Sequence, residues 1–425
     1  MHSKLSKKQV FSLYGKHVSR GKAQFFKKFR MELVMDRREG IYFYDKDGKR
    51  LINCHCNGGV FNLGHRNPEI IRAVKEALDH YDIGNHHLVS EPRALLGERL
   101  TALTPEGLDR VIFGSSGGEA IDLAIKLAMG NTKRRKVVSA RGGYHGHTGL
   151  ALATGDEKFR KPFHYELPDF VQVPFGDLEA LRRTVDSRTA AVILEPIPAT
   201  LGIVVPPDDY LPKVREICDE TGALFIADEV QTGLGRTGKF WAVEHWQVIP
   251  DILVTGKGLS GGIYPITATC YREKLDAVFE EDPFIHISTF GGSEVGCFAA
   301  LKTLEISSSE SFLTHVNDMA ELFRRELERV AAGFKKPPFR LRQKGLMMGL
   351  EFPDASHGMA ACKMLYDSGI FSVFSGNDPA VVQFLPPLVI TAEQAEETVD
   401  LLQEAMRSLY GLKGKLLLGA LKWLA

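Results

Sequence analysis

The sequence predicts an α/β fold organised around a mostly parallel β-sheet. Short runs of aliphatic and β-branched residues recur through the middle of the chain, at 111–113, 136–140, 191–194, 224–227, 252–255 and 266–271. Two segments with helical spacing of apolar residues, 119–129 and 210–221, lie between some of these runs. Strands that alternate with helices are typical of a sheet whose faces are covered by helices.

The elements outside this region follow from local signals. Residues 41–52 contain two strand-like runs joined by an Asp-Gly pair, which favours the tight turn of a β-hairpin. The last third of the chain is rich in helical patterns, with a charged helix near 318–330. Residues 333–338 contain Gly and Pro and predict a connector into a smaller α+β region that ends near Tyr410.

Composition excludes several classes of protein. The 425 residues include 53 Lys and Arg and 53 Asp and Glu, so the formal net charge is zero, which argues against binding to nucleic acid. The length allows two or three domains. Six cysteines are too few for a disulfide framework, so we expect reduced thiols and a cytoplasmic protein. No apolar run approaches the about 18 residues that a membrane span needs, so none is expected.

Both ends of the chain are unusual in charge. Nine Lys and Arg residues precede Glu32, the first acidic residue. Residues 411–425 are rich in Leu, and their only charged side chains are lysines. We expect a solvated basic arm and a fraying terminal helix, while targeting to a membrane or organelle stays open.

One glycine-rich segment imitates a nucleotide-binding motif. Residues 233–238 match G-x-G-x-x-G, and Lys239 makes the segment resemble a P-loop. A P-loop needs a hydroxyl after its Lys, where this chain has Phe240, and a dinucleotide loop should leave its strand directly. Residues 228–232, with two carboxylates, intervene, so we do not expect a nucleotide site.

Two clusters of potential metal ligands also occur. Cys54, His55 and Cys56 are consecutive, and His145 and His147 are separated by one residue. Adjacent ligands without a matching second pair make a poor tetrahedral site, so we expect no metal.

Three features, in chain order, fit an aldehyde cofactor that carries a phosphate. Residues 114–120, Gly-Ser-Ser-Gly-Gly-Glu-Ala, join a strand to a helix, where free N–H groups make an anion site. Asp228 ends a buried strand, and a carboxylate there can keep a pyridine nitrogen protonated. Lys257 follows another strand between two glycines and can form a Schiff base. Taken singly, each feature is also compatible with a helix cap, a surface acid or a loop lysine.

Together these features resemble the class III aminotransferases, which are pyridoxal-phosphate enzymes of fold type I. The resemblance extends from Gly40 to about Leu409 and is most specific at 225–238 and 250–257. Supporting matches lie at 59–65, 144–146, 195–196, 288–292 and 385–388. The resemblance implies a large domain with a mostly parallel seven-stranded sheet and a smaller α+β domain formed from both termini. The expected divisions are 1–56 and 309–410 for the small domain, 57–308 for the cofactor domain, and 411–425 for the tail.

The resemblance also implies roles for individual residues. Lys257 would form the Schiff base with pyridoxal 5'-phosphate and then move a proton, and Asp228 would pair with the ring nitrogen. Tyr144 would stack on the ring with His145 beside it, and Gln231 would lie near the ring hydroxyl.

The phosphate and the subunit contact are implied in the same way. Ser116, Gly117 and Gly118 would hold the phosphate. Thr289 would reach the phosphate of the partner subunit, because active sites in this family lie at the interface of a homodimer.

Substrate-facing positions depart from the family pattern. Many members have an arginine where this chain has Gln383, and a glutamate five residues after the Glu of the Glu-Pro pair, where this chain has Thr200 after Glu195. Ornithine-type members have an arginine at the position of His147. Neither an amide nor a neutral imidazole reproduces a bidentate Arg–carboxylate contact. We take His147, Glu195, Thr200 and Gln383 as candidate substrate residues and infer that the Arg/Glu carboxylate switch is absent.

The leading hypothesis is an aminotransferase that moves an amino group from an amine or amino acid donor to a keto or aldehyde acceptor. A racemase or epimerase on the same scaffold is the alternative, although Thr200 is a poor second acid/base for it. A non-catalytic binding protein is disfavoured by the intact Lys257 and Asp228. A neighbouring basic residue such as Arg141 could still replace the missing arginines, and substrates would then be ordinary amino acids.

Overall fold

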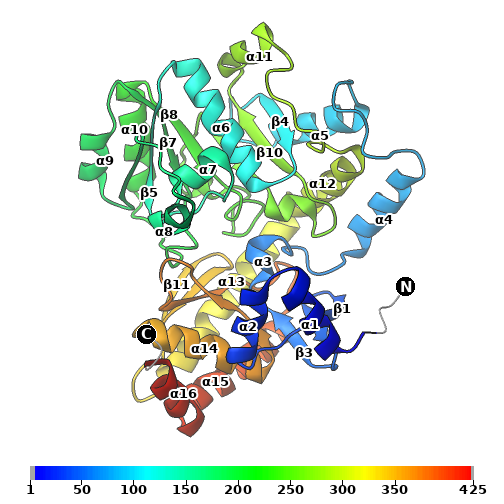
Figure 1. Ribbon diagram of the computed structural model, residues 1–425, viewed down its shortest axis with the longest axis vertical. Helices are drawn as coiled ribbons and strands as arrows, with labels where there is room; N and C mark the ends of the chain where they lie inside the picture. Colours follow the sequence, from blue (N-terminus) through cyan, green and yellow to red (C-terminus); the bar gives the residue numbers. More distant parts are fainter. Residues whose placement is uncertain (1–4, 423–425) are drawn as a thin grey trace.

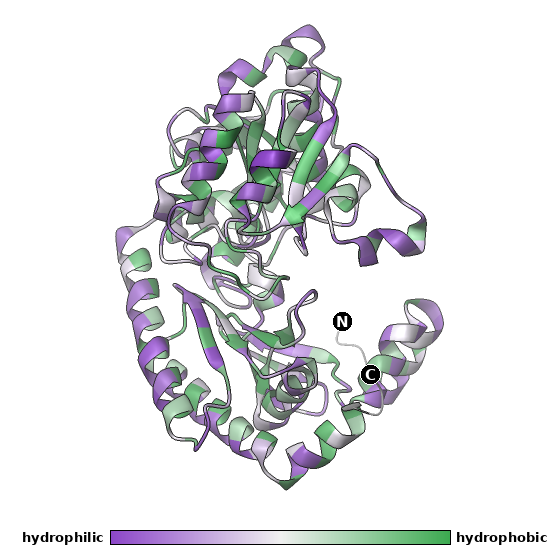
Figure 2. Cartoon of the chain, turned by 90° about the vertical axis from the view of Figure 1, so that its left-hand side faces the viewer, coloured by the Kyte–Doolittle hydropathy of each residue, from purple (hydrophilic) through white to green (hydrophobic). Residues whose placement is uncertain are grey.

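The computed structural model describes residues 5–422, which form two parts that lie one above the other (Figure 1). The upper part is built on one large sheet, and the lower part contains two small sheets together with both ends of the described chain. Hydrophobic residues gather on the strands inside both parts, and hydrophilic residues lie on the helices at the periphery (Figure 2). No helix within 5–422 combines the length and the apolar character needed to cross a membrane.

The upper sheet has seven strands in the order β4-β10-β9-β8-β7-β5-β6. Their bounds are Arg110–Gly114 (β4), Lys136–Arg141 (β5), Phe170–Pro174 (β6), Thr189–Leu194 (β7), Leu224–Asp228 (β8), Ile252–Thr255 (β9) and Thr267–Tyr271 (β10). The strands from β9 to β6 are parallel, whereas β10 pairs antiparallel with both β4 and β9. The prediction of an α/β fold with a mostly parallel sheet is therefore confirmed.

Alternate residues of the central strands supply two hydrophobic cores. Ile193, Ile226 and Val254 face α6 (Gly117–Thr132), and residues one position away face α10 (Tyr210–Thr221). Because both faces are covered, β7, β8 and β9 are buried along their whole length. Strand β6 was not predicted from the sequence, because it is a partly exposed edge strand with only five residues.

Further helices before, between and after these strands complete the upper part. They are α3 (Cys56–Gly59), α4 (Pro68–Leu78), α5 (Glu91–Thr101), α7 (Gly149–Thr154), α8 (Glu157–Arg160), α9 (Leu178–Thr184), α11 (Ala277–Glu281) and α12 (Glu294–Ser307). Short 3-10 turns lie at Lys161–Phe163, Ala242–Trp246, Lys257–Ser260 and Glu273–Leu275.

The lower part combines segments from both ends of the chain. One sheet has the order β1-β2-β3-β13 and the other β11-β12-β15-β14. The strands are Met35–Glu39 (β1), Tyr42–Asp45 (β2), Arg50–Asn53 (β3), Arg340–Lys344 (β11), Met347–Glu351 (β12), Ile370–Phe371 (β13), Val373–Phe374 (β14) and Val381–Phe384 (β15). The helices are α13 (Glu310–Ala332), α14 (Ala355–Ser368) and α15 (Ala392–Tyr410). The predicted hairpin is thus β2–β3, while the divisions expected at 57, 309 and 411 stay predictions.

The termini are more ordered than we expected. The basic arm forms two helices, α1 (Lys7–His17) and α2 (Arg20–Lys28), with Phe11 and Ala23 buried. The Leu-rich tail forms α16 (Leu412–Lys422), and its Leu421 is buried in the core of the lower part. The described tail is therefore a packed helix rather than a fraying one, because its apolar side bears on α14 and α15.

Candidate active site

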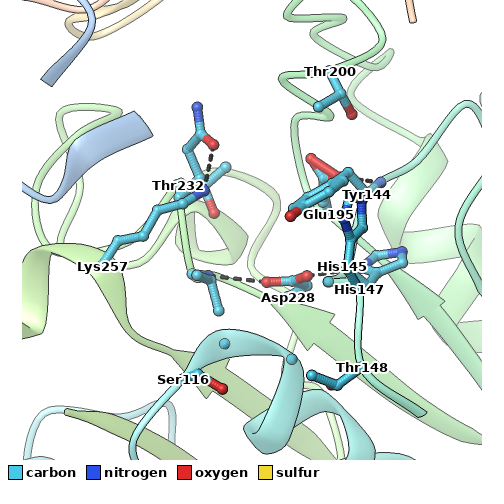
Figure 3. Close-up of a pocket in the computed structure, with 15 residues that line it drawn as sticks. Ser116, Tyr144, His145, His147, Thr148, Glu195, Thr200, Asp228, Thr232 and Lys257 are labelled. Carbon is cyan, nitrogen blue, oxygen red and sulfur yellow. Dashed lines mark hydrogen bonds and ion pairs between the residues drawn. The ribbon is translucent and has the colours of Figure 1, made fainter. Parts of the chain in front are cut away.

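A cavity of about 320 Å³ lies where the carboxyl ends of the parallel strands meet (Figure 3). Glu195 directly follows β7, Asp228 is the last residue of β8, and Lys257 follows β9 by two residues. Tyr144 follows β5 at the same edge. This edge is where open α/β sheets bind ligands, because the loops after neighbouring parallel strands converge there. The lining residues are Ser116, Gly117, Gly118, Tyr144, His145, Gly146, His147, Thr148, Glu195, Thr200, Asp228, Val230, Gln231, Thr232 and Lys257.

The start of α6 provides the floor of the cavity. Ser116 caps the helix, and its hydroxyl accepts a hydrogen bond from the N–H of Glu119. Gly117 and Gly118 form the first turn, whose N–H groups have no partner within the helix. A Cβ atom on Gly118 would lie 2.5 Å from Oγ1 of Thr148, so any larger residue there would have to displace Thr148. Free N–H groups and the positive end of the helix dipole make this turn an anion site.

A buried acid–base pair lies deeper in the cavity. Nδ1 of His145 is 2.7 Å from Oδ2 of Asp228, and Oδ1 of Asp228 accepts the N–H of Val230 at 3.1 Å. Burial alone would lower the pKa of His145, but the hydrogen bond and the charge of Asp228 outweigh it, and the pKa is raised. These two hydrogen bonds fix the side chain of Asp228 in the lining of the cavity.

Lys257 extends its amine into the same cavity. Its Nζ atom donates to Oε1 of Gln231 at 2.6 Å (Figure 3). Burial lowers the pKa of Lys257, while Asp228 and Glu195 act in the opposite direction. The backbone of Lys257 has a positive φ of 37°, a strained conformation that the surrounding fold must maintain. A desolvated amine of this kind is more readily neutral, and only the neutral form is a nucleophile.

Glu195 fixes two loops that border the cavity. One carboxylate oxygen accepts the N–H of Tyr144 at 2.9 Å, and the other accepts the N–H of Ala199 at 3.1 Å. Burial, with a contribution from Asp228, raises the pKa of Glu195 to about 7. The sequence predicted Glu195 only as a substrate residue, because the Glu-Pro motif does not reveal contacts with backbone N–H groups.

Tyr144 and His147 contribute aromatic rings to the lining of the cavity, and Phe159 packs against the ring of His147. The ring centroid of His147 lies 5.1 Å from the ring centroid of Tyr144 and 4.9 Å from that of Phe159. Thr200 lines the same side and donates a hydrogen bond to the carbonyl of Gly142 at 3.3 Å. Phe159 was not predicted, because a lone Phe on a short helix carries no sequence signal. No arginine is present among the described residues that line the cavity.

Two candidates do not line this cavity. Gln383 lies on β15, behind Gln231, and its carboxamide contacts Gln231 and the Ala199 carbonyl. Thr289 is exposed on the segment 282–291 of the upper part. Thr289 is not among the residues that line the cavity, and its expected contact with the phosphate of a partner subunit stays a prediction.

The segments that imitate a nucleotide-binding motif and a metal site contain residues buried in the fold. Arg236, in the glycine-rich segment, is buried and donates to Asn62 and to the carbonyls of Leu346 and Pro386, so it links the two parts of the molecule. Cys54 and Cys56 are buried free thiols. Within residues 5–422, no group of three His, Cys, Asp or Glu residues is arranged to hold a metal ion.

Comparison with known proteins identifies the family to which this chain belongs. Residues 26–406 match the family model "Aminotransferase class-III". The chain is a class III aminotransferase. It is 54% identical over 400 residues to an uncharacterised aminotransferase of Archaeoglobus fulgidus, covering 94% of this chain and 93% of the relative. It is 38% identical over 377 residues to a putrescine aminotransferase of Pectobacterium atrosepticum, covering 86% and 81%.

Solved structures agree with this aminotransferase family. The ornithine aminotransferase of Toxoplasma gondii superimposes with a TM-score of 0.88 at 27% identity, covering 96% of each chain. A second structure of that enzyme has pyridoxal phosphate at its active site. Class III aminotransferases depend on this cofactor. The cavity described above fits it, because an anion site, a buried carboxylate and a buried amine converge in one place.

Proposed function

We propose that this aminotransferase moves an amino group from a primary amine donor to a carbonyl acceptor at Lys257, without the Arg/Glu carboxylate switch. The observation that carries the proposal is the shared cavity of Lys257 and Asp228, whose described lining contains no arginine. Pyridoxal phosphate, when bound, supplies an electron sink that stabilises negative charge at the substrate carbon.

The residues of this chain would divide the work as follows. The first turn of α6, with Ser116, would hold the phosphate, and Asp228 would keep the ring nitrogen protonated. Lys257 would bind the aldehyde carbon and, once released, carry a proton as a base and then as an acid. Tyr144 and His145 would orient the ring and the carboxylate of Asp228.

The lining favours donors without a distal carboxylate. A carboxylate entering the cavity would find no guanidinium among the described lining residues and would meet Glu195, which repels it when ionised. An amine with a neutral or cationic distal end avoids both penalties. The 38% identity to a putrescine aminotransferase supports diamines as donors.

We further infer a homodimer with shared active sites and a cytoplasmic location. Exposed Leu88, Val89, Phe284, Ile285 and Phe290 belong to two neighbouring segments that also include Thr289. An apolar patch of this kind is typical of a subunit interface. The location is supported by the six free, buried cysteines.

A panel of donors and acceptors tests the proposal. Putrescine, a monoamine and 4-aminobutyrate are added to the cofactor-loaded enzyme, and the visible absorbance of bound cofactor is followed. We expect bleaching by the first two donors, recovery on adding a keto acid, and a much slower reaction with 4-aminobutyrate. Preference for 4-aminobutyrate would contradict the missing switch. Racemisation of an amino acid without any acceptor would favour the epimerase alternative.

The same preparation tests the dimer. Phe284→Asp and Phe290→Asp place charges in the apolar patch, and we expect monomers by light scattering with loss of activity. Phe163→Asp, at another exposed phenylalanine, is the matched control and should leave the assembly unchanged.

A further inference from the structure

Two carboxamides link Lys257 to the backbone of Ala199. Nζ of Lys257 donates to Oε1 of Gln231 at 2.6 Å (Figure 3), and Nε2 of Gln231 donates to Oε1 of Gln383 at 3.4 Å. Nε2 of Gln383 then donates to the carbonyl of Ala199 at 3.3 Å. The chain of hydrogen bonds runs from Lys257 in the upper part through Gln383 on β15 of the lower part and back to Ala199, which follows β7 in the upper part.

The direction of this chain is set at its far end. A backbone carbonyl can only accept a hydrogen bond, so Gln383 must direct its NH₂ group to Ala199 and its oxygen to Gln231. Gln231 must then direct its NH₂ group to Gln383, which leaves its oxygen for Lys257. One carbonyl therefore fixes both amides, whose two ends would otherwise be interchangeable.

The packing leaves the two amides little freedom. Gln383 is 5% exposed on β15, between β12 and β14. Gly58 closes the other side of the pair, since a Cβ atom there would lie 3.2 Å from both Oε1 of Gln231 and Cε of Lys257. A glycine at this point allows Lys257 and Gln231 to approach each other.

We propose that Gln383 is a positioning residue that acts through Gln231 to keep a carbonyl oxygen, rather than an N–H group, turned toward the amine of Lys257. The inference rests on the proposed function only in taking Lys257 as the reactive amine. It gives Gln383 a role that the family's arginine cannot play, because a guanidinium donates hydrogen bonds and accepts none.

The charged groups around Lys257 determine how this role is measured. Asp228 on β8 and Glu195 after β7 favour the ammonium form, and burial disfavours it. His55 faces the same amine, and burial together with Lys257 lowers the pKa of His55 to about 4, so it is neutral near pH 7. The oxygen of Gln231 stabilises the ammonium form as well. Loss of this oxygen should lower the pKa of Lys257 further.

The test follows the acetylation of Lys257 with pH in the full chain after removal of the cofactor, using acetic anhydride and mass spectrometry. We expect Gln383→Met, similar in size but without hydrogen bonds, to lower the midpoint by about 0.5–1 pH unit. Gln343→Met is the matched control. Gln343 lies on β11 of the same sheet and donates hydrogen bonds to the carbonyls of Ala320 and Gly345, without contact with Lys257. It should leave the midpoint unchanged.

Two further variants separate positioning from general disturbance. Gln383→Glu keeps an oxygen toward Gln231 and adds a negative charge, so the midpoint should rise. In a Gln231→Met background, Gln383→Met should not change the midpoint further, because no hydrogen bond then connects position 383 with Lys257. An unchanged midpoint in folded Gln383→Met, a lower one in Gln383→Glu, or an equal shift in the Gln231→Met background would overturn the proposal. No amino donor is used in this test. Its result is therefore independent of the donor panel, and failure of the proposed function can be distinguished from failure of the proposed role of Gln383.

Discussion

Nδ1 of His145 lies 2.7 Å from Oδ2 of Asp228, and both side chains are buried beneath the cavity. His145 therefore contacts the same side chain that the proposed function pairs with the ring nitrogen of the cofactor. Without it, Asp228 would keep only the N–H of Val230 as a partner. A buried carboxylate with one neutral donor is costly, so the pair bears on stability as well as on catalysis.

Replacement of His145 should therefore destabilise the protein in a pH-dependent way. Asp228 raises the pKa of His145 above its unfolded value, so the stabilisation is complete below about pH 6.5 and is lost as the pH rises through the folded pKa. We expect His145→Leu to lower the free energy of unfolding by about 3 kcal/mol at pH 6 and by less at pH 9. Urea denaturation at both pH values measures this. A difference that grows with pH would show that the pair is not the cause.

Lys257→Ala should abolish turnover while the cofactor still binds. Removal of the amine eliminates the nucleophile and the proton carrier, and a loss of at least about a thousandfold is expected. The first turn of α6 and Asp228 are untouched, so equilibrium dialysis should still detect bound pyridoxal phosphate. Turnover near that of the unaltered enzyme would refute the role of Lys257.

Glu195→Gln should impair catalysis although the two side chains have the same shape. Two backbone N–H groups, those of Tyr144 and Ala199, each need an acceptor oxygen, and glutamine offers only one. A buried donor left unpaired costs about 1–3 kcal/mol, so kcat/KM should fall about tenfold or more.

The same variant should also change how stability depends on pH. Burial raises the pKa of Glu195 to about 7, so the folded state holds this proton more tightly than the unfolded chain, and stability from this group falls between about pH 4.5 and pH 7. Thermal melts across this range should show a smaller fall in Glu195→Gln. A pH dependence identical to that of the unaltered enzyme would mean that Glu195 titrates normally.

Gly118→Ala should weaken cofactor binding. The new Cβ atom would lie 2.5 Å from Oγ1 of Thr148, which forces apart the loop and the helix turn that form the anion site. We expect the Kd for pyridoxal phosphate to rise about tenfold, and Thr148→Ala in the same chain to restore part of the affinity. Gly376→Ala, where a Cβ atom meets nothing within 4 Å, is the control. Equal affinities in the two single variants would exclude the steric explanation.

Gln383→Arg should shift the preference of the enzyme from diamine donors to donors with a distal carboxylate. Gln383 itself does not line the cavity, but the longer side chain of arginine would extend a guanidinium toward it as a carboxylate anchor, so the rate with 4-aminobutyrate should rise about tenfold. It cannot accept from Gln231, so the rate with putrescine should fall. Unchanged rates with 4-aminobutyrate would mean that position 383 does not face the donor's distal end.

Local chemistry made part of the site predictable. A carboxylate at the end of one buried strand, a lysine after the next and glycines before a helix are recognisable because parallel strands bring their carboxyl ends to one edge. Asp228 and Lys257 were predicted in this way, and both line one cavity in the structure, while their roles stay predictions. β6 was missed because a short, partly exposed edge strand lacks a strong pattern of burial.

The sequence by itself determined the α/β fold, the aminotransferase family and the residues proposed to perform the chemistry, because these depend on periodicity and on ordered motifs. Only the tertiary structure decided what Glu195 and Gln383 contact. Their partners are the backbone N–H groups of Tyr144 and Ala199 and the carbonyl of Ala199, and backbone groups are the same in every residue. Such contacts leave no trace in the identity of the partner residue, so they become visible only when the chain is folded.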